Sequence, residues 1–324
     1  MGPPKLSDFR IAATELPELK DGEALIEVVY LSMDPYLRGR MSEGKSDTAP
    51  MQRGDVMVGS VVGRVLRSHD PSLSYGDYVE GFLGWQQYGI APAKQLRKLD
   101  PQAGPLSASL SVMGMPGLTA YFGLLDICKP KRGETVVVSG AAGAVGSIVG
   151  QIARLKGCPV VGIAGSDEKV KWLTEELGFD SAFNYKAHPD TYSKLKEFCS
   201  KGIDCYFDNV GGTITDAVFG LLNQNARIAI CGQISQYNNT CTELAPRNLS
   251  QILVKTATVR GFLVMQYLDQ AREALIEIGG WVREGKLKYR ETFVDGLENA
   301  PAAFLGLLKG DNTGKMLVRV SVER

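Results

Sequence analysis

The small residues at positions 141–146 have the spacing of a phosphate-binding turn. The pattern is Ala141-x-Gly143-x-x-Gly146, a variant of the dinucleotide-binding fingerprint with alanine in place of the first glycine. Gly143 and Gly146 lack a Cβ, so the backbone can approach a pyrophosphate and the following helix can pack close to the preceding strand. The phosphates would face unpaired N–H groups at the helix N-terminus. The alternative is a tight strand-to-helix turn without a ligand.

The segments that flank this turn are those that a dinucleotide site requires. Thr135–Val138 is a β-branched run typical of a strand buried on both faces. Apolar residues then recur at helical spacing: Val145, Ile148, Val149, Ile152 and Leu155. Gly157 is a typical helix terminator, and Pro159–Ala164 is a second apolar strand. Together they predict one β-turn-α-β half of a dinucleotide-binding fold.

The end of the second strand indicates which dinucleotide binds. An NAD site places Asp or Glu there to hold the ribose hydroxyls. Here the strand ends in the small, neutral residues Ala164-Gly165-Ser166, and Lys169 lies on the next turn. This arrangement favours the 2′-phosphate of NADP. The alternatives are that Asp167 or Glu168 takes the acidic role, or that Lys169 is a solvated helix residue.

Composition excludes several other functions. The 324 residues are enough for two domains, and 36 basic residues balance 36 acidic ones, so no electrostatic footprint for nucleic acid or an anionic membrane is evident. The uncharged stretches 101–125 and 135–153 contain prolines, glycines or the strand-turn-helix, so neither predicts a membrane span. The six cysteines form no Cys-x-x-Cys pair, and Cys231 is interpreted as a small buried residue inside a strand. We therefore expect a cytoplasmic protein.

The remaining pattern predicts two kinds of structure. The first hundred residues are rich in strands and turns and predict a mostly antiparallel unit, with strands at 25–30, 56–66, 77–81 and 85–90. A helix over 118–125 leads into alternating strands and helices, with strands at 203–207, 227–231 and 256–261 and a helix at 271–283. A helix at 302–308 and a strand at 315–320 would rejoin the first unit. Because ligands of open parallel sheets bind beyond the carboxyl ends of strands, a nicotinamide should lie near 208–212, 232–237 and 262–264.

Separate motifs along nearly the whole chain carry a resemblance to a known family. They are SMDPYLR at 32–38, MPGLTAY at 115–121, AAGAVGSIVG at 141–150, GSDEKV at 165–170, CYFDNVGG at 205–212, IAICGQISQYN at 228–238 and GDNTGK at 310–315. The sequence resembles the zinc-independent medium-chain dehydrogenases/reductases, and among them the prostaglandin reductase, leukotriene hydroxydehydrogenase and alkenal double-bond reductase family. This implies an α/β fold: a Rossmann doubly wound parallel sheet over 116–294, plus a β-rich GroES-like barrel domain over 1–115 and 295–324.

The resemblance also implies a set of NADPH-binding residues. Gly143, Ala144, Val145 and Gly146 would hold the pyrophosphate, and Lys169 and Tyr185 the 2′-phosphate. The ribose and nicotinamide would be lined by Asn209 and by Cys231, Gly232, Gln233, Ile234, Ser235, Gln236 and Tyr237. Phe262, Leu263 and Val264 would offer backbone groups to the carboxamide, and Asn312 would reach the cofactor. Tyr185 could instead be a surface aromatic residue, and Asn209 a turn former.

The chemistry that remains is hydride transfer to an activated C=C bond. The two histidines, His69 and His188, have no Cys or Glu at ligand spacing, and Gly59-Ser60-Val61 stands where zinc-containing relatives carry Gly-His-Glu, so no metal site is predicted. Hydride from NADPH would add to the β-carbon of an enone or enal, and charge would develop on the carbonyl oxygen. Tyr237 is the first candidate to stabilise that oxygen; Tyr36 could line the substrate pocket or be a core tyrosine.

The sequence is therefore consistent with three functions. The first is NADPH-dependent reduction of a small, lipid-derived enal or enone, with oxo-prostaglandins, leukotrienes and alkenals as substrate classes. The second is a zinc-free quinone reductase, and the third a non-catalytic, crystallin-like NADPH-binding protein. The strand at 256–262 could pair across a two-fold axis, so a homodimer is expected.

Overall fold

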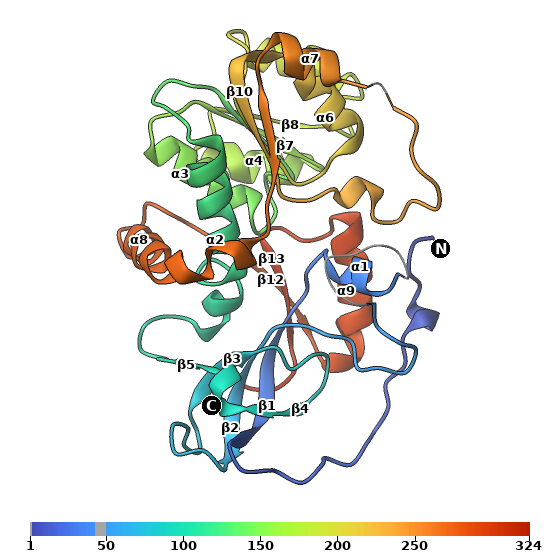
Figure 1. Ribbon diagram of the computed structural model, residues 1–324, viewed down its shortest axis with the longest axis vertical. Helices are drawn as coiled ribbons and strands as arrows, with labels where there is room; N and C mark the ends of the chain where they lie inside the picture. The colour runs from blue at the N-terminus through green and yellow to red at the C-terminus, as the bar shows by residue number, and fades with distance from the viewer. Residues whose placement is uncertain (1, 43–49, 246) are drawn as a thin grey trace. The chain divides into compact units, whose positions relative to one another are not determined.

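The computed structural model describes residues 2–42, 50–245 and 247–324. The chain divides into two compact units, Met1–Ser111 with Glu291–Arg324, and Val112–Arg290. The first unit is therefore built from both ends of the chain, coloured blue to cyan and red in Figure 1. The α/β class, with a parallel Rossmann sheet and a separate β-rich sheet, is confirmed.

The unit Val112–Arg290 contains a six-stranded sheet whose strand pairs are all parallel. Its order is β11 (Thr258–Gly261), β10 (Leu222–Ile230), β9 (Ile203–Asp208), β6 (Val136–Ser139), β7 (Val160–Ala164) and β8 (Ser181–Asn184). The chain runs outward from β6 to β8 and then returns to place β9 on the other side of β6. Strand order reverses between β6 and β9, and ligands of such sheets bind beside this switch point.

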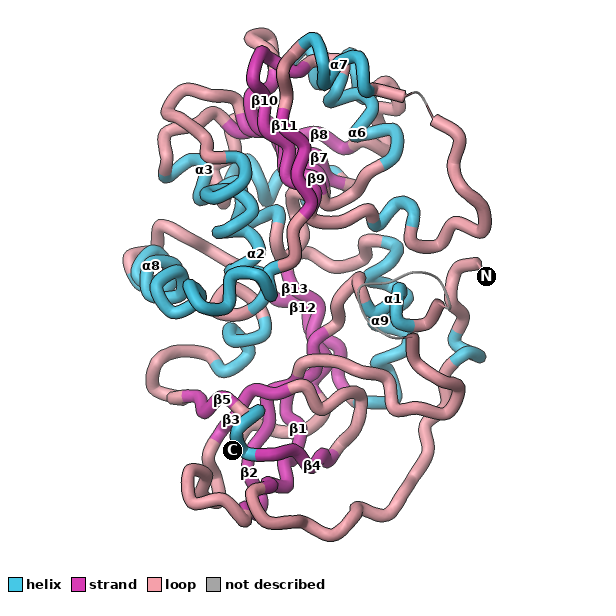
Figure 2. Tube along the Cα trace, viewed as in Figure 1, coloured by secondary structure: helices cyan, strands magenta, loops and turns pink. Residues whose placement is uncertain are grey.

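Helices cover both faces of this sheet. Figure 2 shows α3 (Gly146–Leu155) on one side of the strands and α6 (Gly212–Phe219) on the other. The other α-helices of the unit are α2 (Met115–Phe122), α4 (Asp167–Lys171), α5 (Thr191–Phe198), α7 (Leu249–Val254) and α8 (Ala271–Arg283). Two π-helical segments, η4 (Gly123–Cys128) and η5 (Trp172–Glu176), continue α2 and α4, and two 3-10 segments are η6 (Ile234–Gln236) and η7 (Val264–Gln270).

Helix α3 lies close to strand β6 because Gly146 has no side chain. A Cβ at this position would lie 2.4 Å from the carbonyl oxygen of Gly140 and 2.8 Å from Cα of Ala141. Both contacts are with backbone, which cannot give way cheaply. The last glycine of the predicted turn is therefore required by the approach of helix to strand, as its place in the fingerprint suggests.

The other unit is built on a seven-stranded sheet. Its order is β12 (Glu291–Asp295), β13 (Lys315–Arg319), β1 (Glu23–Ser32), β2 (Val61–Ser68), β3 (Tyr78–Gly81) and β5 (Arg97–Leu99), with β4 (Tyr88–Pro92) paired to β1. Its helical segments are α1 (Leu37–Arg40), α9 (Ala300–Lys309) and the 3-10 segments Leu6–Asp8, Ala93–Gln95, Leu106–Leu110 and Leu297–Asn299. Phe304 of α9 is fully buried in the core against this sheet.

The structure corrects three expectations, and it contains strand β12, which was not predicted. Strand β12 lacked a sequence signal, and it pairs with β13 in parallel. Within the predicted strand 56–66, only residues from Val61 onward are in a strand. Strand β11 begins at Thr258 rather than Thr256, whose positive φ of 46° is incompatible with an extended chain. Cys231 lies just after β10, half-buried, rather than inside a strand.

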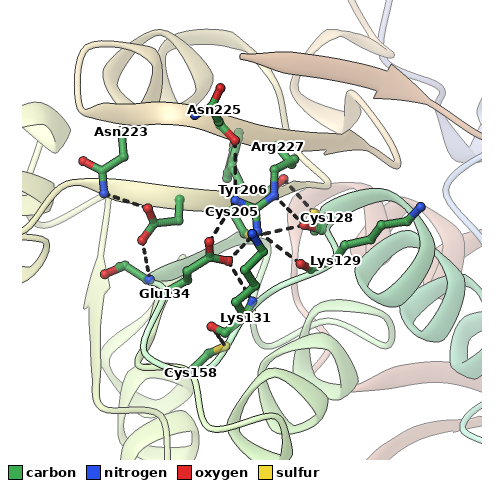
Figure 3. Close-up of polar contacts among 12 residues, drawn as sticks. Cys128, Lys129, Lys131, Glu134, Cys158, Cys205, Tyr206, Asn223, Asn225 and Arg227 are labelled. Carbon is green, nitrogen blue, oxygen red and sulfur yellow. Dashed lines mark hydrogen bonds and ion pairs between the residues drawn. The ribbon is translucent and has the colours of Figure 1, made fainter. Parts of the chain in front are cut away.

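The opposite, amino-terminal edge of the Rossmann sheet is held by Arg227 of β10. Its guanidinium donates to the carbonyl oxygens of Cys128 (2.8 Å) and Lys129 (3.2 Å). It also pairs with the carboxylate of Glu134, with 3.2 Å from Nη1 to Oε1 (Figure 3). Carbonyl groups at a helix end lack partners within the helix, so Arg227 supplies donors to the end of η4.

None of the described helices has both the length and the apolar character needed to cross a membrane.

Candidate functional site

A hollow of about 370 Å³ opens beside the carboxyl ends of β10 and β11. It is lined by Ile230, Cys231, Gly232, Gln233, Tyr237, Gly261, Phe262, Leu263 and Gln266. The structure thus brings together residues predicted from two separate segments, the loop after β10 and the residues after β11. Sequence reasoning missed Gln266 on η7. The signal that could have identified it is its position one 3-10 turn after Leu263, which places the two residues on the same side of the helix. None of the lining residues is Asp, Glu, Lys, Arg or His, so the wall suits an uncharged ring.

Tyr237 lies on this wall, at the end of a short 3-10 turn. Its hydroxyl oxygen accepts a hydrogen bond from the backbone N–H of Gln233 at 3.3 Å. Ile234, Ser235 and Gln236 form the turn between them, and Ser235 is anchored through its hydroxyl to the carbonyl oxygen of Val210 at 2.6 Å. The turn is therefore closed by one hydrogen bond and anchored at its centre to Val210, just after β9.

A buried carboxylate, Asp208, organises the strand ends behind this loop. It is fully buried at the end of β9 and accepts hydrogen bonds from six donors: the side chains of Ser139 (3.0 Å), Tyr206 (2.9 Å), Thr215 (2.7 Å) and Gln233 (3.0 Å) and the backbone N–H groups of Val210 and Gly211 (2.9 Å each). These donors come from the ends of β6 and β9, from α6 and from the loop after β10. Asp208 thus sets the position of Gln233, whose N–H reaches Tyr237.

Two groups beside Asp208 are held in their neutral forms. Burial, followed by the negative charge of Asp208, raises the pKa of Cys231 to about 12. The same two causes, in the same order, hold the pKa of Tyr206 well above its usual value. Cys231 is therefore a neutral thiol at physiological pH and is not suited to act as a nucleophile.

Asn209 is fixed at the switch point between β6 and β9. Its backbone N–H donates to the hydroxyl of Ser139 at 3.0 Å, and its side-chain amide donates to the carbonyl oxygen of Ser139 at 2.8 Å. Asn209 is thus more than a turn former before Val210-Gly211, because its side chain joins two neighbouring strand ends.

The predicted pyrophosphate turn lies directly before α3. The N–H of Gly143 donates to the carbonyl oxygen of Gly140 at 3.0 Å, and Gly146 is the first residue of the helix, with Val145 as its N-cap. Ala144 and Val145 lie between the two glycines. The turn and the first helical N–H groups have the arrangement that binds phosphate in dinucleotide sites.

The end of β7 is where the adenosine ribose would lie. Ser166 caps α4 by accepting a hydrogen bond from the N–H of Lys169 at 3.3 Å. Asp167 accepts a hydrogen bond from the side chain of Asn184 at 2.9 Å. Tyr185 follows β8, and its ring lies against Gly165. Lys186, which sequence reasoning missed, lies against the same glycine; its position next to Tyr185 was the available signal.

The remaining predicted site residues are Val264, Tyr36 and Asn312. Val264 is half-buried at the start of η7, next to the exposed Leu263. Tyr36 and Asn312 belong to the other unit and are described within it. Tyr36 is 38% exposed and is the N-cap of α1, whereas Asn312 is buried and donates from its side chain to the carbonyl oxygen of Gly314 at 2.7 Å.

Among residues 2–42, 50–245 and 247–324, no group of three or more His, Cys, Asp and Glu side chains could hold a metal ion. The described side chains therefore do not form a zinc site.

Comparison with known proteins agrees with the fold. Residues 1–99 match the family model described as the N-terminal domain of oxidoreductase, and residues 144–278 the one described as zinc-binding dehydrogenase. Prostaglandin reductase 1 of Bos taurus is 49% identical over 324 residues, covering 98% of this chain and 96% of the relative. The chain belongs to the zinc-independent medium-chain dehydrogenases/reductases.

The names of two further similar proteins include the cofactor. The NADP(+)-dependent 2-alkenal reductase of Nicotiana tabacum is 44% identical over 329 residues, covering 99% of this chain and 95% of the relative. The crystal structure of CurA from Vibrio vulnificus in complex with NADPH has a TM-score of 0.95 and 45% identity, covering 99% of this chain and 97% of that one. The family resemblance predicted from the sequence motifs is confirmed.

Proposed function

We propose that this chain reduces the C=C bond of α,β-unsaturated aldehydes and ketones with NADPH. The observation that carries the proposal is the uncharged hollow at the ends of β10 and β11, with Tyr237 on its wall. Membership of an NADP-dependent family supports the cofactor. The two strand ends, the Asn209 position and the turn before α3 fit the parts of a bound dinucleotide in the order that this fold uses.

NADPH, when bound, supplies the hydride that adds to the β-carbon of the substrate, and water supplies the proton that the α-carbon takes up. The protein's part is to hold the nicotinamide against the loop Cys231–Tyr237 and the backbone of Phe262–Val264. As the hydride adds, negative charge develops on the substrate's carbonyl oxygen, and a donor fixed beside that position lowers the barrier. We assign this donor to the hydroxyl of Tyr237. We propose that this hydrogen bond stabilises the developing charge.

The substrate class follows from the same wall. Apolar side chains and amides surround the hollow, which suits a small, lipid-derived enal or enone rather than a charged metabolite. The names of the relatives, prostaglandin reductase and 2-alkenal reductase, point to substrates of this class. The six free thiols fit a reducing compartment, and we propose the cytosol.

The test is consumption of NADPH with a medium-chain 2-alkenal, measured beside the saturated aldehyde of equal length and beside a simple quinone. We expect turnover with the alkenal alone, and mass spectrometry should find a product that has gained two hydrogens and kept its aldehyde. Turnover of the saturated aldehyde would indicate carbonyl reduction. Turnover confined to the quinone, or tight NADPH binding without any turnover, would overturn the proposal.

We further propose that two copies associate through β11. This strand lies at the edge of the Rossmann sheet, and all four of its residues are exposed. An edge strand presents unpaired N–H and C=O groups that a second copy can satisfy. Exposed apolar side chains follow directly on η7, namely Met265 and Leu268.

A further inference from the structure

The residues after β8 lie beside the end of β7. The two strands pair in parallel, with Ala164 opposite Asn184, and the N–H of Tyr185 continues the pairing by donating to the carbonyl oxygen of Ala164 at 3.1 Å. The next residue, Lys186, therefore lies next to Gly165, the first residue after β7.

Gly165 brings the Lys186 side chain against the backbone. A Cβ at position 165 would lie 3.4 Å from Cε of Lys186, 3.4 Å from the Tyr185 ring and 3.7 Å from the ammonium nitrogen of Lys186. These are ordinary contact distances. The ammonium thus lies within one side-chain length of the position where an NAD-specific relative would carry its acidic residue.

One of the two acidic residues that follow β7 already has a hydrogen-bond partner. Asp167, the first carboxylate after β7, is hydrogen-bonded to the side-chain amide of Asn184 at 2.9 Å. Within the described part of the chain, no carboxylate forms an ion pair with Lys186, whereas nearby Lys171 pairs with Glu175 at 3.8 Å. The strand end therefore combines a small neutral turn with an ammonium group that has no anionic partner among these residues.

We infer that Lys186 binds the 2′-phosphate of NADPH and determines, together with the predicted Lys169, the preference for NADPH over NADH. The two lysines come from different connections, Lys169 from α4 and Lys186 from the segment after β8. A phosphate between them would be approached from two sides, and charge-assisted hydrogen bonds to phosphate are stronger than neutral ones. This inference deepens the proposed function and rests only on its cofactor, not on the reduction of an enone.

A charge series at position 186 tests the inference by binding alone. NADPH and NADH affinities are measured by quenching of intrinsic fluorescence for the native protein and for K186R, K186Q and K186E, with 2′,5′-ADP and 5′-AMP as competing probes. We expect K186R to bind NADPH nearly as the native protein does. K186Q should bind it about tenfold more weakly, and K186E more weakly still. NADH and 5′-AMP affinities should stay unchanged, because neither ligand carries a 2′-phosphate.

The matched control is K171Q, which removes the same charge from the exposed side of α4 and should leave both cofactors unaffected. Equal loss of NADPH and NADH affinity in K186Q, or no loss of either, would overturn the inference and leave the proposed enone reduction intact. A native protein that binds NADH as tightly as NADPH would overturn the proposed cofactor itself. The two failures can therefore be told apart.

Discussion

The backbone N–H of Gln233 donates to the hydroxyl oxygen of Tyr237 at 3.3 Å, across a single 3-10 turn. Gln233 also donates from its side chain to the buried Asp208 at 3.0 Å. The tyrosine that we assign to the reaction is therefore connected to the end of β9 through one residue. This connection fixes the hydroxyl of Tyr237 relative to the sheet. We therefore expect different effects from replacing Tyr237 and from replacing Asp208.

Replacing Tyr237 with Phe should lower kcat by about a hundredfold or more, because one fixed donor to a developing oxyanion contributes on this scale. The affinity for NADPH should change little, since the aromatic ring stays in place. Steady-state kinetics with a 2-alkenal and a separate binding titration would check this. Tyr75→Phe is the control, because Tyr75 is 74% exposed in the other unit. Unchanged turnover in Y237F would remove Tyr237 from the mechanism.

Replacing Asp208 with Asn should destabilise the protein by about 1–3 kcal/mol, the cost of leaving a buried donor without an acceptor. The NH₂ group of the new side chain at position 208 would face the side-chain NH₂ of Gln233. Rotating the Gln233 amide by 180° would not help, because its NH₂ also donates to the carbonyl oxygen of Gly232 at 3.0 Å and that bond would be lost. Urea unfolding measures the loss, with the exposed Asp167→Asn as control.

A second substitution tests whether this contact accounts for the loss. In D208N/Q233E, the new amide would face a carboxylate instead of another donor. The loss of unfolding free energy in the double variant should therefore be smaller than the summed losses of the two single variants by about 0.5 kcal/mol or more. Strict additivity would show that the Asp208–Gln233 contact does not account for the effect.

The pair of Glu134 and Arg227 predicts a dependence of stability on pH. Burial raises the pKa of Glu134, but hydrogen bonds from Arg227 and from the N–H of Lys131, with the charge of Arg227, outweigh it, so the pKa lies below the ordinary 4.5. A carboxyl whose pKa is depressed in the folded state stabilises the protein above its ordinary pKa, and this contribution is lost as pH falls through the folded value.

The free energy of unfolding should therefore fall more steeply below about pH 4.5 in the native protein than in Glu134→Gln. Denaturant unfolding at a series of pH values measures this difference. Glu175→Gln, which removes an exposed carboxylate paired to Lys171, should keep the native pH dependence. Parallel curves for the native protein and E134Q would contradict the prediction.

Replacing Lys169 with Ala should weaken NADPH binding about tenfold and spare NADH, because NADH lacks the 2′-phosphate that the ammonium group would bind. Fluorescence titration with both cofactors measures the two affinities. Lys194→Ala is the control, since Lys194 pairs with Glu197 on α5 at 2.8 Å. Equal losses with both cofactors would mean that Lys169 does not contact the phosphate.

Placing a lysine at Val259 of β11 should separate the proposed dimer, because a charged side chain on an edge strand opposes pairing with another strand. Light scattering coupled to size exclusion should give about twice the chain mass of 35.1 kDa for the native protein and 35.1 kDa for V259K. Val322→Lys, at a position 75% exposed in the other unit, should stay dimeric. A native protein that is monomeric at micromolar concentration would contradict the proposal.

Segments with local signals could be predicted from the sequence. The helix expected over 271–283 coincides with α8, and the strand expected over 159–164 agrees with β7 except for its first residue. Helical spacing of apolar residues and β-branched runs act within one element, so no distant partner is needed to recognise them. The residues around the hollow were reached by the rule that ligands lie beyond the carboxyl ends of parallel strands.

Segments defined by a distant partner could not be predicted. Strand β12 has five half-buried or exposed residues and becomes a strand by pairing with β13, where Glu291 lies opposite Lys315. Arg227 contacts the carbonyl oxygen of Cys128, which lies 99 residues earlier. Neither contact leaves a periodic pattern in the sequence, because each depends on which distant segments the folded chain brings together.

The sequence by itself determined the glycine-containing turn at 141–146, the helix and strands around it, the small neutral end of β7 and the family to which the chain belongs. Only the tertiary structure decided that donors from Ser139, Thr215 and Gln233 converge on Asp208, and that Lys186 lies against Gly165. The reason is physical. Parallel pairing places the carboxyl ends of strands from remote segments along one edge, so side chains that are far apart in the chain become neighbours there.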